Sequence, residues 1–240
     1  MAGTPLDIKV VRKGGERHLY TWAAIIAVLV VFAGFARSYY MKGMFGTPDL
    51  SALKHVHGLV MTAWFTLFLV QARLVATGRT RLHRKLGIAG GVLAGLVVIV
   101  GTATALVGAR NGATPGPPPL VFLAIPLGDM AVFLGLVCAA LLYRKRSDYH
   151  KRLMLLASLS ILTAAIARIP AQLLQAGGLP AFFGATDVLI LACVAYDTVK
   201  NRRLHPAMLA GALAVFASQV ARFLIAGTPQ WTSFARWLVG

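Results

Sequence analysis

The chain alternates between long apolar runs and short polar connections. Seven apolar runs cover most of the sequence: 19–36, 55–76, 86–107, 120–143, 153–174, 179–196 and 206–226. Because a helix rises about 1.5 Å per residue, about 18 to 24 residues suffice to cross a hydrocarbon core of about 30 Å. The pattern therefore predicts an all-α protein, a seven-helix transmembrane bundle without a soluble domain.

The segment after the last run differs from the others. It reads GTPQWTSFARWLVG and places Trp231, Phe234 and Trp237 at helical spacing beside Arg236. Aromatic side chains gather at membrane interfaces, so this pattern predicts a short interfacial helix. The expected organisation is a cytoplasmic N-terminal segment 1–18, a transmembrane domain 19–226 and a tail 227–240 on the outer leaflet.

The net charge of +17 would suggest a nucleic-acid partner in a soluble protein. Here most lysines and arginines precede the first run or follow the second, fourth and sixth runs, which places them on one side of the membrane. By the positive-inside rule this side and the N-terminus are cytoplasmic, and an odd number of crossings puts the C-terminus outside. We therefore expect a multi-pass protein of a bacterial-type inner membrane, surrounded by lipid and without a nucleic-acid partner.

Several polar side chains interrupt the apolar runs. Such groups are costly in hydrocarbon and need a partner or a purpose. The candidates are His57, Asp129, Arg168, Gln172, Asp187, Gln219 and Arg222. We expect Asp129 near mid-membrane and the others in the outer half. One interpretation is that they join helices by ion pairs and amide hydrogen bonds. The other is an outer-half binding site for an anionic or quinone-like molecule.

Two segments, LHRKLG and YHKRLM, open the third and fifth runs with the same order of residue types. Both enter the membrane from the cytoplasmic side, so His83 and His150 are expected at equal depth on parallel helices. If these helices are neighbours, the two imidazoles could bind one metal, the iron of a haem. The basic side chains that would neutralise haem propionates are Arg84, Lys85, Lys151 and Arg152. The alternative is that both histidines are ordinary interfacial residues.

A stripe of glycines follows the first of these histidines. Gly87, Gly91 and Gly95 come after His83 at steps of four, which places them on one helix face. Stripes of small residues commonly pack against a neighbouring helix. A porphyrin face is the other partner that such a surface would accept.

The segment HGLVMTAW from His57, together with LHRKLG and YHKRLM, resembles the core of diheme transmembrane cytochromes that exchange electrons with ascorbate or ferric iron. In that family four successive helices each contribute one histidine. His57, His83 and His150 match the first, second and fourth of these, and the run 120–143 lacks the third. The resemblance therefore implies one haem b at most, between His83 and His150. The same segments resemble small uncharacterised bacterial multispan proteins, some of them linked to assembly of haem-copper oxidases.

These patterns lead to one functional hypothesis and two alternatives. The hypothesis is a b-type cytochrome-like membrane protein that carries electrons between a cytoplasmic-side haem and the outer-half site or a membrane redox partner. The alternatives are a non-redox accessory or assembly protein, and a small-solute or proton transporter that uses the intramembrane Asp and Arg residues. The last run has no lysine for a retinal Schiff base, and the chain has no familiar hydrolase or nucleotide motif. No catalytic residue is assigned.

Overall fold

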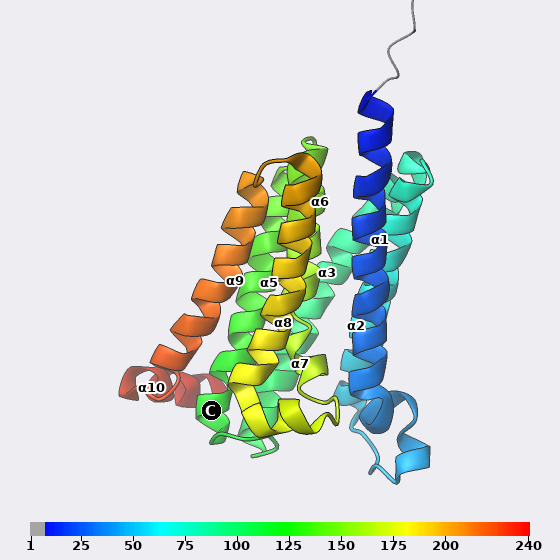
Figure 1. Ribbon diagram of the computed structural model, residues 1–240. Helices are drawn as coiled ribbons and strands as arrows, with labels where there is room; N and C mark the ends of the chain where they lie inside the picture. The colour runs from blue at the N-terminus through cyan, green and yellow to red at the C-terminus, as the bar shows by residue number, and fades with distance from the viewer. Residues whose placement is uncertain (1–7) are drawn as a thin grey trace, which may run out of the picture.

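The computed structural model describes the backbone of residues 8–240 and the side chains from residue 18 onward. Throughout this part of the chain the regular structure is helical, without strands (Figure 1). Most of the segment 1–18, which we expected to be cytoplasmic, therefore lies outside the described side chains. Its backbone is already helical from residue 8, because α1 extends over Ile8–Phe35.

Six helices in the described range are long and apolar enough to cross a membrane. They are α1, α2 (Ala52–Ala76), α3 (Thr80–Arg110), α5 (Ala124–Leu142) with the one-turn α4 (Pro119–Phe122) before it, α8 (Gln172–Asn201) and α9 (Pro206–Ile225). Successive helices run up and down the bundle (Figure 1). A π-helical turn (Ala36–Tyr40) and a 3-10 turn (Lys42–Phe45) connect α1 to α2.

The expected fifth run, 153–174, is not one helix, so the sequence prediction was wrong here. The chain instead forms α6 (Ser147–Ser160) and the one-turn α7 (Thr163–Ile166), and its last residues already belong to α8. Pro170 cannot donate a backbone hydrogen bond and disfavours helix in the residue before it. Near the end of α6, the hydroxyl of Ser160 donates to the carbonyl of Ala157 at 2.9 Å, a bond that competes with regular helix.

The expected start of the sixth run at residue 179 coincides with a break inside α8. Gly178 has φ +56° and ψ −144°, a conformation that glycine adopts far more readily than other residues, and Pro180 follows it. The helix therefore consists of a short piece before Gly178 and a long piece after it. Only the long piece corresponds to the apolar run 179–196.

The core lies in the middle of the bundle. Trp64 of α2 contacts Phe133 of α5 edge to face, with ring centroids 4.9 Å apart, and both side chains are buried. At Gly34 of α1, an added Cβ would overlap the carbonyl oxygen of Ala165 in α7. The broken segment is therefore packed directly against α1, inside the bundle.

The tail forms a helix, as its aromatic spacing predicts. Helix α10 (Pro229–Val239) lies across the end of the bundle at the foot of α9 (Figure 1). The hydroxyl of Thr228 caps its first turn, and the indole N–H of Trp231 donates to the carbonyl of Leu120 at 2.8 Å. Ala235 is buried, whereas Trp237 is 75% exposed. The helix thus has one face attached to the bundle and one aromatic face directed away from it.

Candidate functional site

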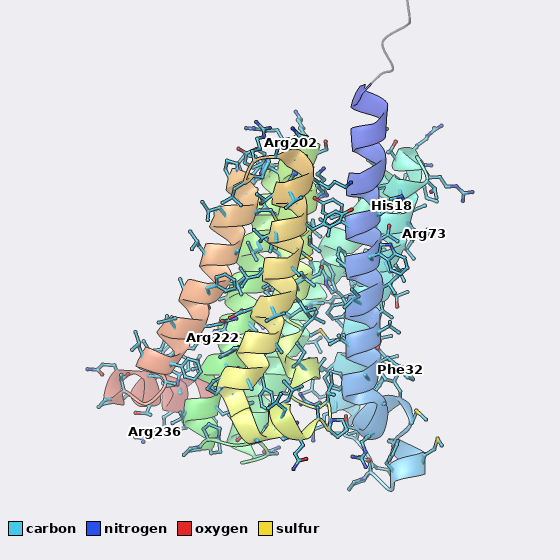
Figure 2. The ribbon with its side chains drawn as sticks, viewed as in Figure 1. His18, Phe32, Arg73, Arg202, Arg222 and Arg236 are labelled. Atoms are coloured by element: carbon cyan, nitrogen blue, oxygen red, sulfur yellow. The ribbon has the colours of Figure 1, made fainter. Side chains whose placement is uncertain are left out.

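The basic connections share one end of the bundle, which we call the basic end. Figure 2 shows Arg73 and Arg202 near this end and Arg236 at the opposite one. The chain alternates in direction, so the connections α2–α3, α5–α6 and α8–α9 all lie at the basic end (Figure 1). This is the arrangement that the charge pattern of the sequence predicts.

The structure brings His83 and His150 together at the basic end. Each lies in the first turn of its helix, α3 or α6, and their ring centroids are 6.2 Å apart with an interplanar angle of 76°. A metal–imidazole bond of about 2 Å on each side, plus roughly 1 Å from nitrogen to ring centre, separates two opposed ligand rings by about 6 Å. The observed separation of the two ring centroids is close to this distance.

The local fold fixes the tautomer of His150. Its Nδ1 lies 2.8 Å from the carbonyl oxygen of Ala140, in the last turn of α5, where a helix leaves carbonyls without backbone partners. Since a carbonyl only accepts, Nδ1 carries the proton and Nε2 of the neutral ring keeps its lone pair. Metal-binding histidines commonly have this arrangement, with the other ring nitrogen held by a backbone carbonyl.

His83 has a different neighbour, the amide of Gln71 in α2. In the orientation that satisfies both amide atoms, the nitrogen donates to Nδ1 of His83 at 2.6 Å and the oxygen accepts from the N–H of Gly87 at 3.1 Å. This orientation leaves the proton of a neutral ring on Nε2. Binding of a metal at Nε2 therefore requires the amide to turn, so that its oxygen accepts from Nδ1.

Arg152 does not have the partner that we expected. We expected it to bind a haem propionate, but its guanidinium donates to both carboxylate oxygens of Asp197 in α8, at 2.9 and 2.8 Å. The side chains of Arg152 and Asp197 are 3% and 1% exposed. The sequence analysis missed Asp197 because it lies just beyond the predicted run 179–196. Lys151 lies 5.4 Å from the ring centre of Tyr20 in α1.

The other two basic side chains expected at this site are Arg84 and Lys85, and both are exposed. Neither forms an ion pair with a carboxylate of the described part of the chain. Of the four expected partners for propionates, Arg152 is therefore bound to Asp197, and Lys151 lies over the ring of Tyr20.

The glycine stripe beside His83 is open. A Cβ added at Gly87, Gly91 or Gly95 would meet no described atom within 4 Å. Such stripes usually pack closely against a neighbouring helix. In the described structure no helix packs closely against these three glycines. The face offers room for a ligand or a lipid chain beside the imidazole pair.

The intramembrane charges form two groups, of which the first joins α5, α8 and α9. Arg222 donates to Asp129 at 2.6 Å, and both side chains are at least nine-tenths buried. One turn away on α9, the amide of Gln219 donates to Asp187 at 2.8 Å. The guanidinium of Arg222 also lies 5.3 Å from the ring centre of Phe183.

The second group surrounds the broken segment. Arg168 donates to the carbonyl of Ala164 at 2.6 Å, and the amide of Gln175 donates to the carbonyls of Ala167 and Ile169. These side chains thus satisfy carbonyls in α7 and in the residues between α7 and Pro170. Arg168, which we expected in an outer-half binding site, therefore has a structural role as well.

His57 lies in the second turn of α2. Its Nδ1 is buried without a hydrogen-bond partner in the described structure. Gln172, at the start of α8, is exposed and takes no part in either group. The residues that we expected to form one outer-half site thus do not come together in one group, and no cluster of three or more His, Cys, Asp or Glu in the described range suits a metal ion.

Comparison of the chain with models of protein families, with curated proteins and with solved structures gives no match.

Proposed function

We propose that the chain crosses a bacterial-type inner membrane seven times, with the basic end in the cytoplasm and the C-terminus outside. In addition to the six long helices, the broken segment α6–α7 makes the fifth crossing in chain order. It packs against α5, α9 and α1 within the bundle. Unwound backbone at membrane depth is tolerated where protein surrounds it, and the carbonyls of this segment find partners in Arg168 and Gln175. Helix α10, with its exposed Trp237, would lie in the outer interface.

We propose further that the protein binds one b-type haem at the basic end and acts as an electron carrier. The observation that carries this proposal is the pair His83 and His150, whose rings lie 6.2 Å apart beside an open glycine face. The haem would supply a one-electron redox centre. His150 is already oriented for ligation by the carbonyl of Ala140, and Arg84 and Lys85 are the exposed cations left for the propionates.

The place for a second redox partner is the ring of His57 near the start of α2, at the end of the bundle opposite to the basic end. A buried ring nitrogen without a hydrogen bond costs about 1–3 kcal/mol, so a ligand that supplies the bond is favoured. A quinone-like molecule with a carbonyl or hydroxyl oxygen has the required chemistry. The group formed by Asp129 and Arg222 is less suitable, because each of these charges already has its partner.

Absorption spectroscopy tests the haem. Purified protein, supplied with haem and reduced with dithionite, should give a sharp Soret band and an α band. His83→Ala and His150→Ala should each abolish the low-spin spectrum. His18→Ala is the matched control, since His18 is exposed on α1 and lies outside the pair. A wild-type protein that stays without these bands after reconstitution would refute the proposal.

A non-redox accessory protein is the second candidate, and the pairing of the intramembrane charges favours it. Arg152 with Asp197, Arg222 with Asp129 and Gln219 with Asp187 all join neighbouring helices. Polar pairs of this kind stabilise membrane bundles without any further activity. A bundle that folds normally but binds no haem would support this candidate.

A further inference from the structure

The backbone changes its hydrogen bonding in the turn between α6 and α7. The N–H of Leu162 donates to the carbonyl of Leu159, and the N–H of Ala165 donates to that of Leu162, so both bonds span three residues instead of four. The carbonyls of Ser160 and Ile161 accept no hydrogen bond from the described part of the chain, although both residues are only 4% exposed. Buried carbonyls without a partner are rare and costly at membrane depth, so these two oxygens favour an electropositive partner.

Three buried hydroxyl groups belong to the same region, those of Ser160, Thr163 and, in α8, Thr186. Ser160 donates to the carbonyl of Ala157 at 2.9 Å, and Thr186 donates to the carbonyl of Phe182 at 3.1 Å. The hydroxyl oxygens of Thr163 and Thr186 lie 2.9 Å apart, and Thr163 donates in this bond because the single proton of Thr186 is already used. The hydroxyl oxygens of Ser160 and Thr163 therefore accept no hydrogen bond from the described residues and keep their lone pairs.

These two hydroxyl oxygens lie on one face of the turn. Ile161 has φ −96° and ψ 7°, and Leu162 has φ −74° and ψ −19°. With about three residues per turn, side chains three positions apart lie above one another, which aligns Ser160 with Thr163. The contact of Thr163 with Thr186 directs this face toward α8. The oxygens thus lie inside the bundle, where α1 also packs against α7.

The surroundings favour a positive charge at this turn. Helix α6 ends here, and the C-terminal end of a helix carries the negative end of its dipole. Asp187 follows Thr186 in α8, accepts a hydrogen bond from Gln219 and forms no ion pair with a described residue. The arginine of the same segment, Arg168, donates to the carbonyl of Ala164. A cation at the turn would therefore be attracted by a carboxylate that lacks a counter-charge.

We propose that the turn between α6 and α7 binds a monovalent metal cation, with Na⁺ as the probe. The ligands are the carbonyl oxygens of Ser160 and Ile161 and the hydroxyl oxygens of Ser160 and Thr163. All four are neutral, whereas protein sites for Ca²⁺ and Mg²⁺ use carboxylates, so the chemistry favours a monovalent ion. At about 1.5 Å per residue, the end of α6 lies about 20 Å from the basic end, and broken helices at such depths coordinate cations through freed carbonyls. The proposal is independent of haem binding.

The test follows thermal unfolding of the purified full-length protein in neutral detergent by tryptophan fluorescence. NaCl or KCl replaces N-methylglucamine chloride at constant ionic strength, so that only the small cation changes. Ser160→Ala and Thr163→Val each remove one ligand. Ser158→Ala is the matched control, because Ser158 is equally buried in α6 and likewise donates to a carbonyl of its own helix, that of Met154, but precedes the turn. The dependence on Na⁺ within each variant is compared, so a general loss of stability does not affect the result.

We expect the unfolding temperature to rise with the Na⁺ concentration and to show saturable binding. The apparent affinity should fall at least tenfold in Ser160→Ala and in Thr163→Val, which corresponds to about 1.4 kcal/mol, and should change little in Ser158→Ala. A stronger effect of K⁺ with the same dependence on the two hydroxyls would support the site and identify K⁺ as its ion. Equal stabilisation by N-methylglucamine, or an unchanged response to Na⁺ in both ligand variants, would show that the turn holds no cation and would overturn the proposal.

Discussion

Replacement of Asp197 should destabilise the bundle by about 3–5 kcal/mol, because the buried guanidinium of Arg152 loses the carboxylate that accepts two of its hydrogen bonds. The two side chains are 1% and 3% exposed and share two hydrogen bonds of 2.9 and 2.8 Å. Hydrogen bonds to charged groups contribute about 1.5–3 kcal/mol each. Arg152 keeps its bond to the carbonyl of Asp148, so we expect the lower half of that range for Asp197→Ala.

The assay is unfolding of the purified protein in mixed micelles, followed by tryptophan fluorescence, for a double-mutant cycle. Arg152→Met alone should cost a similar amount, whereas Arg152→Met with Asp197→Leu should cost far less than the two single changes together, because apolar pairs often replace buried ion pairs without loss. Asp148→Ala is the control. Its carboxylate is 49% exposed and pairs with His205, so it should cost less than about 1 kcal/mol. Additive single effects, or a cost for Asp197→Ala no greater than that of the control, would refute the reasoning.

Three further predictions concern packing, charge and topology. Gly34→Ala should destabilise the bundle by about 1–3 kcal/mol or more in the same assay, since its Cβ would overlap the Ala165 carbonyl. Gly87→Ala should leave the stability unchanged or raise it by up to about 1 kcal/mol, since alanine favours helix and its Cβ meets no described atom; similar losses at both positions would contradict the open glycine face. Lys42 holds the pKa of Asp49 below its usual value through a hydrogen bond and its charge, so NMR titration should show that pKa rising in Lys42→Gln. Any stability that this pair contributes is present above the pKa of Asp49 in the unfolded chain, about 3.9, and is lost as the pH falls through its pKa in the folded protein. An unchanged pKa of Asp49 in Lys42→Gln would argue against the contact. A reporter enzyme that is active only outside the cytoplasm should be active when fused to the C-terminus, and a reporter that is active only in the cytoplasm should be inactive there. The opposite result would disprove the proposed orientation.

The sequence by itself predicted helices long and apolar enough to cross a membrane, of which the described structure contains six, and the end of the bundle at which the basic connections gather. These properties depend on local quantities, namely the length of an apolar run and the residue types at its ends, which need no knowledge of neighbours. The same information predicts that His83 and His150 lie at the same depth, because the distance of a residue from the start of its helix determines its position along the bundle axis. The aromatic spacing after Thr228 likewise sufficed to predict α10.

Only the tertiary structure decided which polar groups meet. Arg152 binds Asp197, which is 45 residues away, and Arg222 binds Asp129 at a separation of 93, because α6 packs against α8 and α5 against α9. Neither pairing is visible in a periodic pattern, since periodicity describes one helix and not its neighbour. The break after Ser160 was missed for a related reason. Apolar length alone does not show that the side chains of Arg168 and Gln175 will satisfy carbonyls in and just after α7.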